Sequence, residues 1–198
     1  DSYGGGRGTR LDIAKKVIKA IVSNTKLTSG ANFGFIEWSS GGWKTKLRVP
    51  ISAAGAAAIF TDVDNVYATG GTHLKPAMVK ARKQWTTGKI PNWEASCAKN
   101  FVIVITDGNY SDNPIPTIRN MKDSLGIKTF IIGFMGGGTA KREAVATAGG
   151  TEPLYASNQT ELLSKLTEAI QQAIDASLTF STPAVMSDAT SRGYVYQS

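Results

Sequence analysis

The sequence predicts an α/β fold with a doubly wound, mostly parallel sheet, helices on both faces and one antiparallel edge hairpin. First, strand-like and helix-like segments alternate through the middle of the chain. Second, residues 101–106 and 127–134 are apolar almost throughout, which is typical of parallel strands that are buried on both faces. Third, two segments rich in aromatic and branched residues, 33–40 and 43–51, flank a Gly-Gly pair that favours a tight hairpin.

The first helix is predicted directly after Thr9. Thr9 and Asp12 form a capping-box pattern, with Asp in the place where Glu is usual. Apolar residues then recur at helical spacing: Leu11, Ala14, Val17, Ile18, Ile21 and Val22. The hairpin follows, and residues 53–60 are alanine-rich, which predicts a short helix before the middle of the chain.

The second half of the chain continues the alternation. A glycine turn at residues 69–71 opens a helix that reaches Trp85, and Pro76 suits its first turn. The remaining elements are predicted in this order: strand 101–106, helix 115–125, strand 127–134, helix 140–150, short strand 153–157 and a long amphipathic helix, Gln159 to Ala176. Residues 1–176 therefore form one predicted domain. Residues 177–198 have no helical period and are interpreted as an extended tail or linker toward a following domain.

Composition narrows the functional classes. The 198 residues carry a net charge of +7, so nucleic acid or an acidic surface has to be considered as a partner. The basic residues are scattered, however, and no nucleic-acid-binding motif occurs. Cys97 is the sole cysteine and His73 the sole histidine, which excludes a disulfide within the chain and a thiolate zinc site. No apolar stretch approaches the roughly 20 residues of a membrane span, and no signal peptide is present.

Two polar residues are candidates for a site at the carboxyl edge of the sheet. Asp107 follows the apolar strand 101–106, and Thr72 follows Gly70 and Gly71 and precedes a helix. Each also has a local explanation, since Asp107 could cap its own Asp-Gly turn and Thr72 could be a helix N-cap. Loops at the carboxyl ends of parallel strands converge on one crevice. A carboxylate and a hydroxyl there are hard oxygen ligands that suit a magnesium-like cation.

The order of six segments resembles a von Willebrand factor type A domain. These segments are TRLDIAKKVI, FGFIEWS, GGTHLKPA, VIVITDG, IKTFIIGF and AGGTEPLYA, and the resemblance covers about residues 9 to 175. It implies a Rossmann-like sheet whose upper edge holds a metal-ion-dependent adhesion site. In that family an Asp-x-Ser-x-Ser loop, a threonine of a GGT loop and an aspartate of a TDG loop hold the metal. The last two correspond to Thr72 and Asp107, and the cation would be Mg, Mn or Ca.

The Asp-x-Ser-x-Ser loop of the family has no full counterpart. Asp1 lies at about the right distance before Arg10 to be the motif aspartate, but Tyr3 and Gly5 stand where serines belong. The apolar strand that should precede this loop is also absent. Either the loop is degenerate in a truncated chain, or the strand and motif lie upstream and the first residues belong to an insertion. In both cases the resemblance implies an incomplete metal site in this fragment.

A narrower resemblance is to the PilC/PilY family of type IV pilus tip-associated adhesins. The segments VPISAAGAAAIF, SCAKNFVIVITDG and TFSTPAVMSDATSRGYVYQS carry it. It implies an exported, non-enzymatic adhesion and protein-interaction domain at the pilus tip on the cell surface, acting in attachment and pilus biogenesis. The implied partners are minor pilins, host or abiotic surface ligands and a following β-propeller domain of the same protein.

Three other functions are alternatives to adhesion. A nucleotide-binding enzyme could use the glycine-rich segments GGGRG and GFMGGG, but neither matches a known phosphate-binding motif. A hydrolase could use Cys97 with His73, but no nucleophile motif surrounds Cys97. A basic nucleic-acid-binding module would bind any duplex in a salt-dependent manner. The sequence therefore predicts no catalytic site.

Overall fold

The computed structural model describes residues 9–40, 42–68, 70–88, 90, 99–136 and 138–178. The helices are α1 (Arg10–Val22), α2 (Thr25–Thr28), α3 (Gly55–Asp62), α4 (Leu74–Thr86), α5 (Ile115–Leu125), α6 (Thr139–Gly149) and α7 (Gln159–Leu178). The strands are β1 (Phe33–Glu37), β2 (Lys46–Ser52), β3 (Phe101–Thr106), β4 (Lys128–Phe134) and β5 (Leu154–Ala156). Asp1 and Cys97 lie outside the described residues, as does the predicted tail beyond Leu178.

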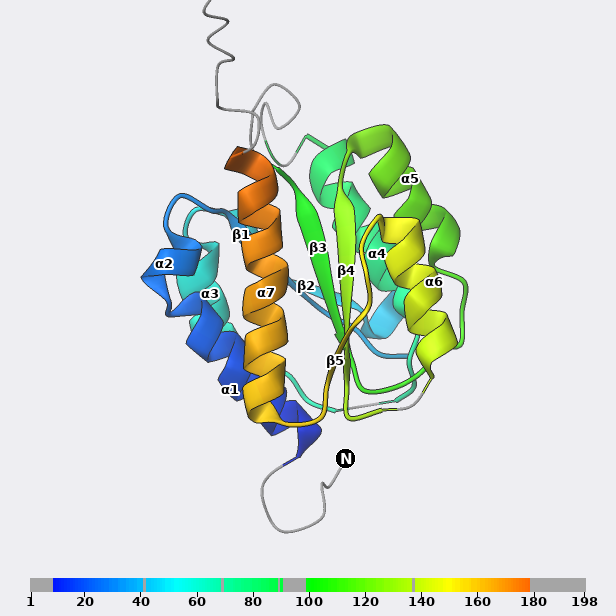
Figure 1. Ribbon diagram of the computed structural model, residues 1–198, viewed down its shortest axis with the longest axis horizontal. Helices are drawn as coiled ribbons and strands as arrows, with labels where there is room; N and C mark the ends of the chain where they lie inside the picture. The colour runs from blue at the N-terminus through cyan, green and yellow to red at the C-terminus, as the bar shows by residue number, and fades with distance from the viewer. Residues whose placement is uncertain are drawn as a thin grey trace, which may run out of the picture.

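The parallel sheet has the order β3-β4-β5, as expected from the alternation of strands and helices. Helices cover both of its faces, with α1 and α7 on one side and α4, α5 and α6 on the other (Figure 1). Phe130 and Ile132 of β4 point into the first layer, and Ile131 points into the second. The predicted α/β architecture is therefore confirmed.

The hairpin differs in two respects from its prediction. Strands β1 and β2 pair antiparallel, but within the described residues they form a separate two-stranded sheet and do not extend the parallel one. Their connection is also longer than a tight Gly-Gly turn. It runs from Trp38 to Thr45 and contains a short 3-10 helix, Gly42–Lys44. Thr45 is buried and Trp38 is partly buried, so residues of this connection pack against the domain instead of forming a minimal turn.

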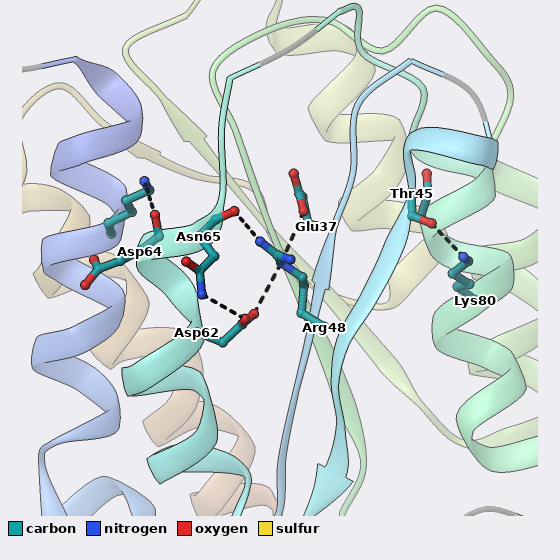
Figure 2. Close-up of polar contacts among 8 residues, drawn as sticks. Glu37, Thr45, Arg48, Asp62, Asp64, Asn65 and Lys80 are labelled. Carbon is teal, nitrogen blue, oxygen red and sulfur yellow. Dashed lines mark hydrogen bonds and ion pairs between the residues drawn. The ribbon is translucent and has the colours of Figure 1, made fainter.

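A charged cluster attaches the hairpin to α3. The Arg48 guanidinium on β2 lies 3.2 Å from Glu37 Oε2 on β1 and 3.2 Å from Asp62 Oδ2 at the end of α3 (Figure 2). It also donates to the Asn65 carbonyl. All three charged side chains are mostly buried, so the opposite charges compensate one another where water is partly excluded.

Strand β3 is less buried than its sequence predicts. The pattern of apolar residues suggests a strand covered on both faces, and β4 has six consecutive buried residues. In β3, by contrast, only Val104 and Thr106 are buried. The reason is its position, because β4 is the one strand that pairs with β3 in the described part of the chain. No described strand pairs with its other edge.

Candidate functional site

The end of β3 presents Asp107 at the carboxyl edge of the sheet. The turn after the strand is held by Thr106 and not by Asp107, since Thr106 Oγ1 contacts the Gly108 carbonyl at 3.0 Å and the Gly108 amide at 3.3 Å. The Asp107 carboxylate instead faces Arg10, whose Nη1 lies 3.5 Å from Asp107 Oδ2. The side chain of Asp107 is 41% exposed. Its carboxylate is therefore available at the surface and is not used to close its own turn.

The loop before α4 brings Thr72 to the same edge. The Thr72 carbonyl accepts a hydrogen bond from the Ser111 amide at 2.9 Å. In addition, a Cβ atom on Gly108 would lie 3.5 Å from Thr72 Oγ1. The loop that contains Thr72 and the loop that follows Asp107 are therefore in contact. The structure brings the two sequence-predicted residues together at one edge of the sheet.

Thr72 is not the N-cap of α4, so the prediction that it caps this helix is wrong. The N-cap is His73, and its side chain makes no capping hydrogen bond. Asp112 supplies the cap from the neighbouring loop, because its Oδ1 accepts from the Leu74 amide at 3.0 Å and its Oδ2 from the Lys75 amide at 2.9 Å. A carboxylate at a helix N-terminus is favoured by the helix dipole. Asp112 thus fixes the start of α4 and leaves the Thr72 hydroxyl out of the cap.

Arg10 is the charged neighbour of Asp107, a contact that the sequence does not reveal. It is the first residue of α1, where a positive charge is disfavoured by the helix dipole. The capping box of Thr9 and Asp12 offsets this, with Thr9 N 2.9 Å from Asp12 Oδ2 and Asp12 N 3.1 Å from Thr9 Oγ1. The sequence feature that could have indicated this contact is an arginine at the first position of a helix, where a positive charge is unusual. Its partner, 97 residues away, could be found only from the fold.

Tyr110 anchors the Asp107 loop to α6. Its hydroxyl donates to the Lys141 carbonyl at 2.9 Å, and Lys141 Nζ donates back to the Tyr110 carbonyl. Burial raises the pKa of the Tyr110 phenol, and the nearby charge of Asp112 raises it further. Tyr110 therefore remains protonated and acts as a hydrogen-bond donor that holds the loop in place.

The residues at this edge do not fit a complete divalent-cation site. Asp107 offers a carboxylate and Thr72 a hydroxyl, whereas a cation of this kind takes six or more oxygen ligands. No group of three or more His, Cys, Asp and Glu side chains suited to a metal occurs within the described residues. The guanidinium of Arg10 beside Asp107 also places a positive charge next to the carboxylate. The contribution of Asp1 stays a prediction, because Asp1 lies outside the described residues.

The edge contains one serine–histidine contact. Ser111 Oγ lies 3.4 Å from His73 Nε2, which is close to the geometry of a nucleophile and its base. Among the described residues, the buried His73 Nδ1 atom has no hydrogen-bond partner that would orient the imidazole from its other side. The adjacent carboxylate, Asp112, is already used by the helix cap. The described residues therefore supply no third group of a catalytic triad here.

The sequence matches the von Willebrand factor type A domain over residues 3–176. No curated protein matches the chain. Solved structures with the same fold include BatB from Bacteroides thetaiotaomicron, with a TM-score of 0.68, 16% identity and coverage of 85% of this chain and 90% of that one. An aerotolerance-related membrane protein from Bacteroides fragilis gives a TM-score of 0.65, 16% identity and coverage of 84% and 90%.

A third similar structure is proximal thread matrix protein 1 from the mussel byssus, in a form with a zinc-occupied MIDAS (metal-ion-dependent adhesion site) motif. It gives a TM-score of 0.64 and 19% identity over 83% of this chain and 42% of that one. At these identities the structures show a shared fold. Together with the match over residues 3–176, they establish that the chain belongs to the von Willebrand factor type A domain family.

Proposed function

We propose that this chain is a non-enzymatic adhesion and protein-interaction domain of a PilC/PilY-like protein at the tip of a type IV pilus. The observation that carries the proposal is the meeting of Asp107 and Thr72 on one edge, supplied by two loops that are in contact. The Asp107 side chain is exposed enough to be reached by a partner. The interaction surface is therefore this carboxyl edge, with Arg10 beside Asp107 as a second charged group.

The glycine-rich segment GFMGGG at the end of β4 does not favour the alternative of a nucleotide-binding enzyme. A phosphate loop needs backbone amides around an open space. Gly133 lies within β4 itself, and the Arg142 guanidinium lies against it, since a Cβ atom there would be 2.7 Å from Arg142 Cζ. Gly138 is approached by Asn109, whose Oδ1 would be 1.8 Å from a Cβ atom there. The glycines thus make room for protein side chains.

The alternative of a nucleic-acid-binding module would require basic residues that are available to phosphates. Several lysines and arginines are instead paired within the domain, as for Lys19 with Asp64 and Arg48 with Glu37. Lys80 Nζ donates to the Thr45 carbonyl at 2.6 Å (Figure 2). These contacts indicate that the basic residues form an ordinary solvated surface and not a continuous stripe that binds phosphates.

A location outside the cell, at the pilus tip, belongs to the same proposal. The similar folds include a membrane protein and a byssal thread matrix protein, which agrees with a type A domain working at or beyond a cell surface. No helix in the described part of the chain is both long and apolar enough to cross a bilayer. The expected partners are minor pilins, surface ligands and a following β-propeller domain. A divalent cation is expected only when a further loop supplies the missing ligands.

The proposal is tested in the bacterium that makes the protein. Asp107→Ala, introduced into the full-length protein, is expected to reduce attachment to surfaces while the protein still reaches the pilus tip by immunogold labelling. Asp123→Asn is the matched control, because Asp123 is an exposed carboxylate on α5 whose ion-pair partner is its neighbour Lys122. Normal attachment with Asp107→Ala, or labelling that never coincides with pilus tips, would show that the proposal is wrong.

A further inference from the structure

Trp43 is the most exposed large apolar side chain in the described part of the chain. Its exposed fraction is 80%, and it belongs to the connection between β1 and β2. A tryptophan ring that becomes buried removes about 150–250 Å² of surface from water, and tryptophan is among the residues that contribute most to binding at protein interfaces. Folding therefore leaves uncovered a large apolar area of the kind that a partner protein covers.

Hydrogen bonds join the connection that carries this ring to the loop that contains Thr72. The Ser39 carbonyl accepts from the His73 amide at 3.0 Å, and the Ser40 hydroxyl accepts from the Gly71 amide. Thr72 lies between these two donors in the sequence, so the connection borders the carboxyl edge that is proposed above as the interaction surface. An inference about the exposed ring therefore rests on the proposed function and names the kind of partner that this edge receives.

The other end of the connection is anchored to the domain. The Thr45 side chain is buried, and the Thr45 carbonyl accepts from Lys80 Nζ at 2.6 Å (Figure 2). The ring itself has a neighbour, since Lys44 Nζ lies 4.8 Å from the centroid of the Trp43 ring. The indole is therefore displayed by a segment that is fixed before and after it. A partner that covers the ring restricts little further motion, which favours binding.

The charge near the ring is positive. Lys44 and Lys46 follow it in the sequence, and Lys80 Nζ contacts the same connection. None of these three lysines forms an ion pair with a carboxylate within the described residues. Glu37, which faces Lys46 across the hairpin, already pairs with Arg48. Three positive charges without a carboxylate partner therefore lie close to one exposed apolar ring.

We propose that Trp43 and these three lysines, here called the tryptophan face, bind an acidic protein surface that has an apolar pocket for the indole. The ring supplies the apolar anchor, and carboxylates of the partner pair with the lysines around it. A single-stranded nucleic acid fits less well, because it stacks successive bases on several aromatic rings. Trp43 is the one exposed large apolar residue among the described residues of this connection.

Site-specific photo-crosslinking in the bacterium that makes the protein tests this proposal. The photoreactive residue p-benzoylphenylalanine replaces Trp43 in the full-length protein, and a second strain carries it in place of Phe60 as the matched control. Phe60 is also an exposed aromatic residue with a lysine near its ring, since Lys19 Nζ lies 5.0 Å from the centroid, but it belongs to α3. Irradiation is expected to cross-link position 43 to a protein through a segment rich in Asp and Glu. Raising the ionic strength before irradiation should lower the yield, because salt screens the charges.

The cross-linked protein is then purified and titrated with the 198-residue chain by surface plasmon resonance. Trp43→Ala is expected to weaken binding about tenfold or more, whereas Phe60→Ala should bind as the parent chain does. Because the Trp43 side chain is exposed, the variant should remain folded, which circular dichroism checks. Lack of a protein cross-link at position 43, or a cross-link to nucleic acid or polysaccharide alone, would overturn the proposal. So would a yield that is equal at position 60 or insensitive to salt, or equal binding by Trp43→Ala and the parent chain.

Failure of the tryptophan face can be separated from failure of the proposed function. If Asp107→Ala reduces attachment while position 43 gives no cross-link, the adhesive edge stands and the tryptophan face is overturned. If position 43 cross-links to an acidic protein that is absent from pili, the tryptophan face stands and the pilus-tip location is wrong.

Discussion

Replacing Asp112 tests whether this residue fixes the carboxyl edge by capping α4. Its carboxylate accepts from two amides, those of Leu74 at 3.0 Å and Lys75 at 2.9 Å. Loss of an N-cap costs about 0.5–2 kcal/mol of the free energy of unfolding. The favourable interaction of a full negative charge with the helix dipole adds about 0.3–1 kcal/mol. Water can replace the contact to the exposed Lys75 amide, so we expect a loss of about 2 kcal/mol for Asp112→Ala.

Urea unfolding followed by circular dichroism measures this loss. Asp112→Asn keeps one acceptor and should lose about half as much, roughly 1 kcal/mol. The Tm of Asp112→Ala should fall by about 4–8 °C for a domain of this size. Asp123→Ala, at an exposed position on α5, should stay within about 0.5 kcal/mol of the parent chain. Equal stability of the two alanine variants would refute the capping role of Asp112.

Three further predictions concern metal, the charged cluster and pH. Isothermal calorimetry with magnesium and manganese should show little or no binding to this chain, and tight binding that survives Asp107→Ala would place the metal elsewhere. Arg48→Ala should destabilise the domain by about 2 kcal/mol in urea unfolding, because it leaves two partly buried carboxylates unpaired; stability equal to the parent chain would contradict this. Glu161 has a pKa lowered from its ordinary value of 4.5 by hydrogen bonds from Ser157, so its stabilisation is present above that value and is lost as pH falls through the lowered pKa. Glu161→Gln should flatten the dependence of Tm on pH below about 4.5, and an unchanged dependence would contradict this.

The fold could be predicted because its signals are local. The capping box at Thr9 and the apolar runs of β3 and β4 are each formed by residues that are close together in the sequence. The structure contains all three features. The partial exposure of β3 could not be predicted from its own residues, because it depends on whether another strand pairs with the edge of β3 that faces away from β4. An apolar run alone does not distinguish a central strand from one at an edge.

The site was predicted in part. Asp107 and Thr72 were proposed from the order of segments, and the structure places both on one edge, while their role in binding stays a prediction. Arg10 and Asp112 were missed because their partners are set by the tertiary fold. Asp112, for example, caps a helix whose first amides lie 38 and 37 residues earlier in the chain.

Binding of the purified 198-residue chain to purified minor pilins tests whether the carboxyl edge is an adhesive surface. Surface plasmon resonance would compare the parent chain, Asp107→Ala and Asp123→Asn, after circular dichroism has shown that all three are folded. We expect saturable binding by the parent chain and by Asp123→Asn, and a loss of at least about tenfold in affinity for Asp107→Ala, because it removes a charged contact at the interface. Equal affinity of all three proteins, or absence of binding by the parent chain, would contradict the assignment of the carboxyl edge as the adhesive surface.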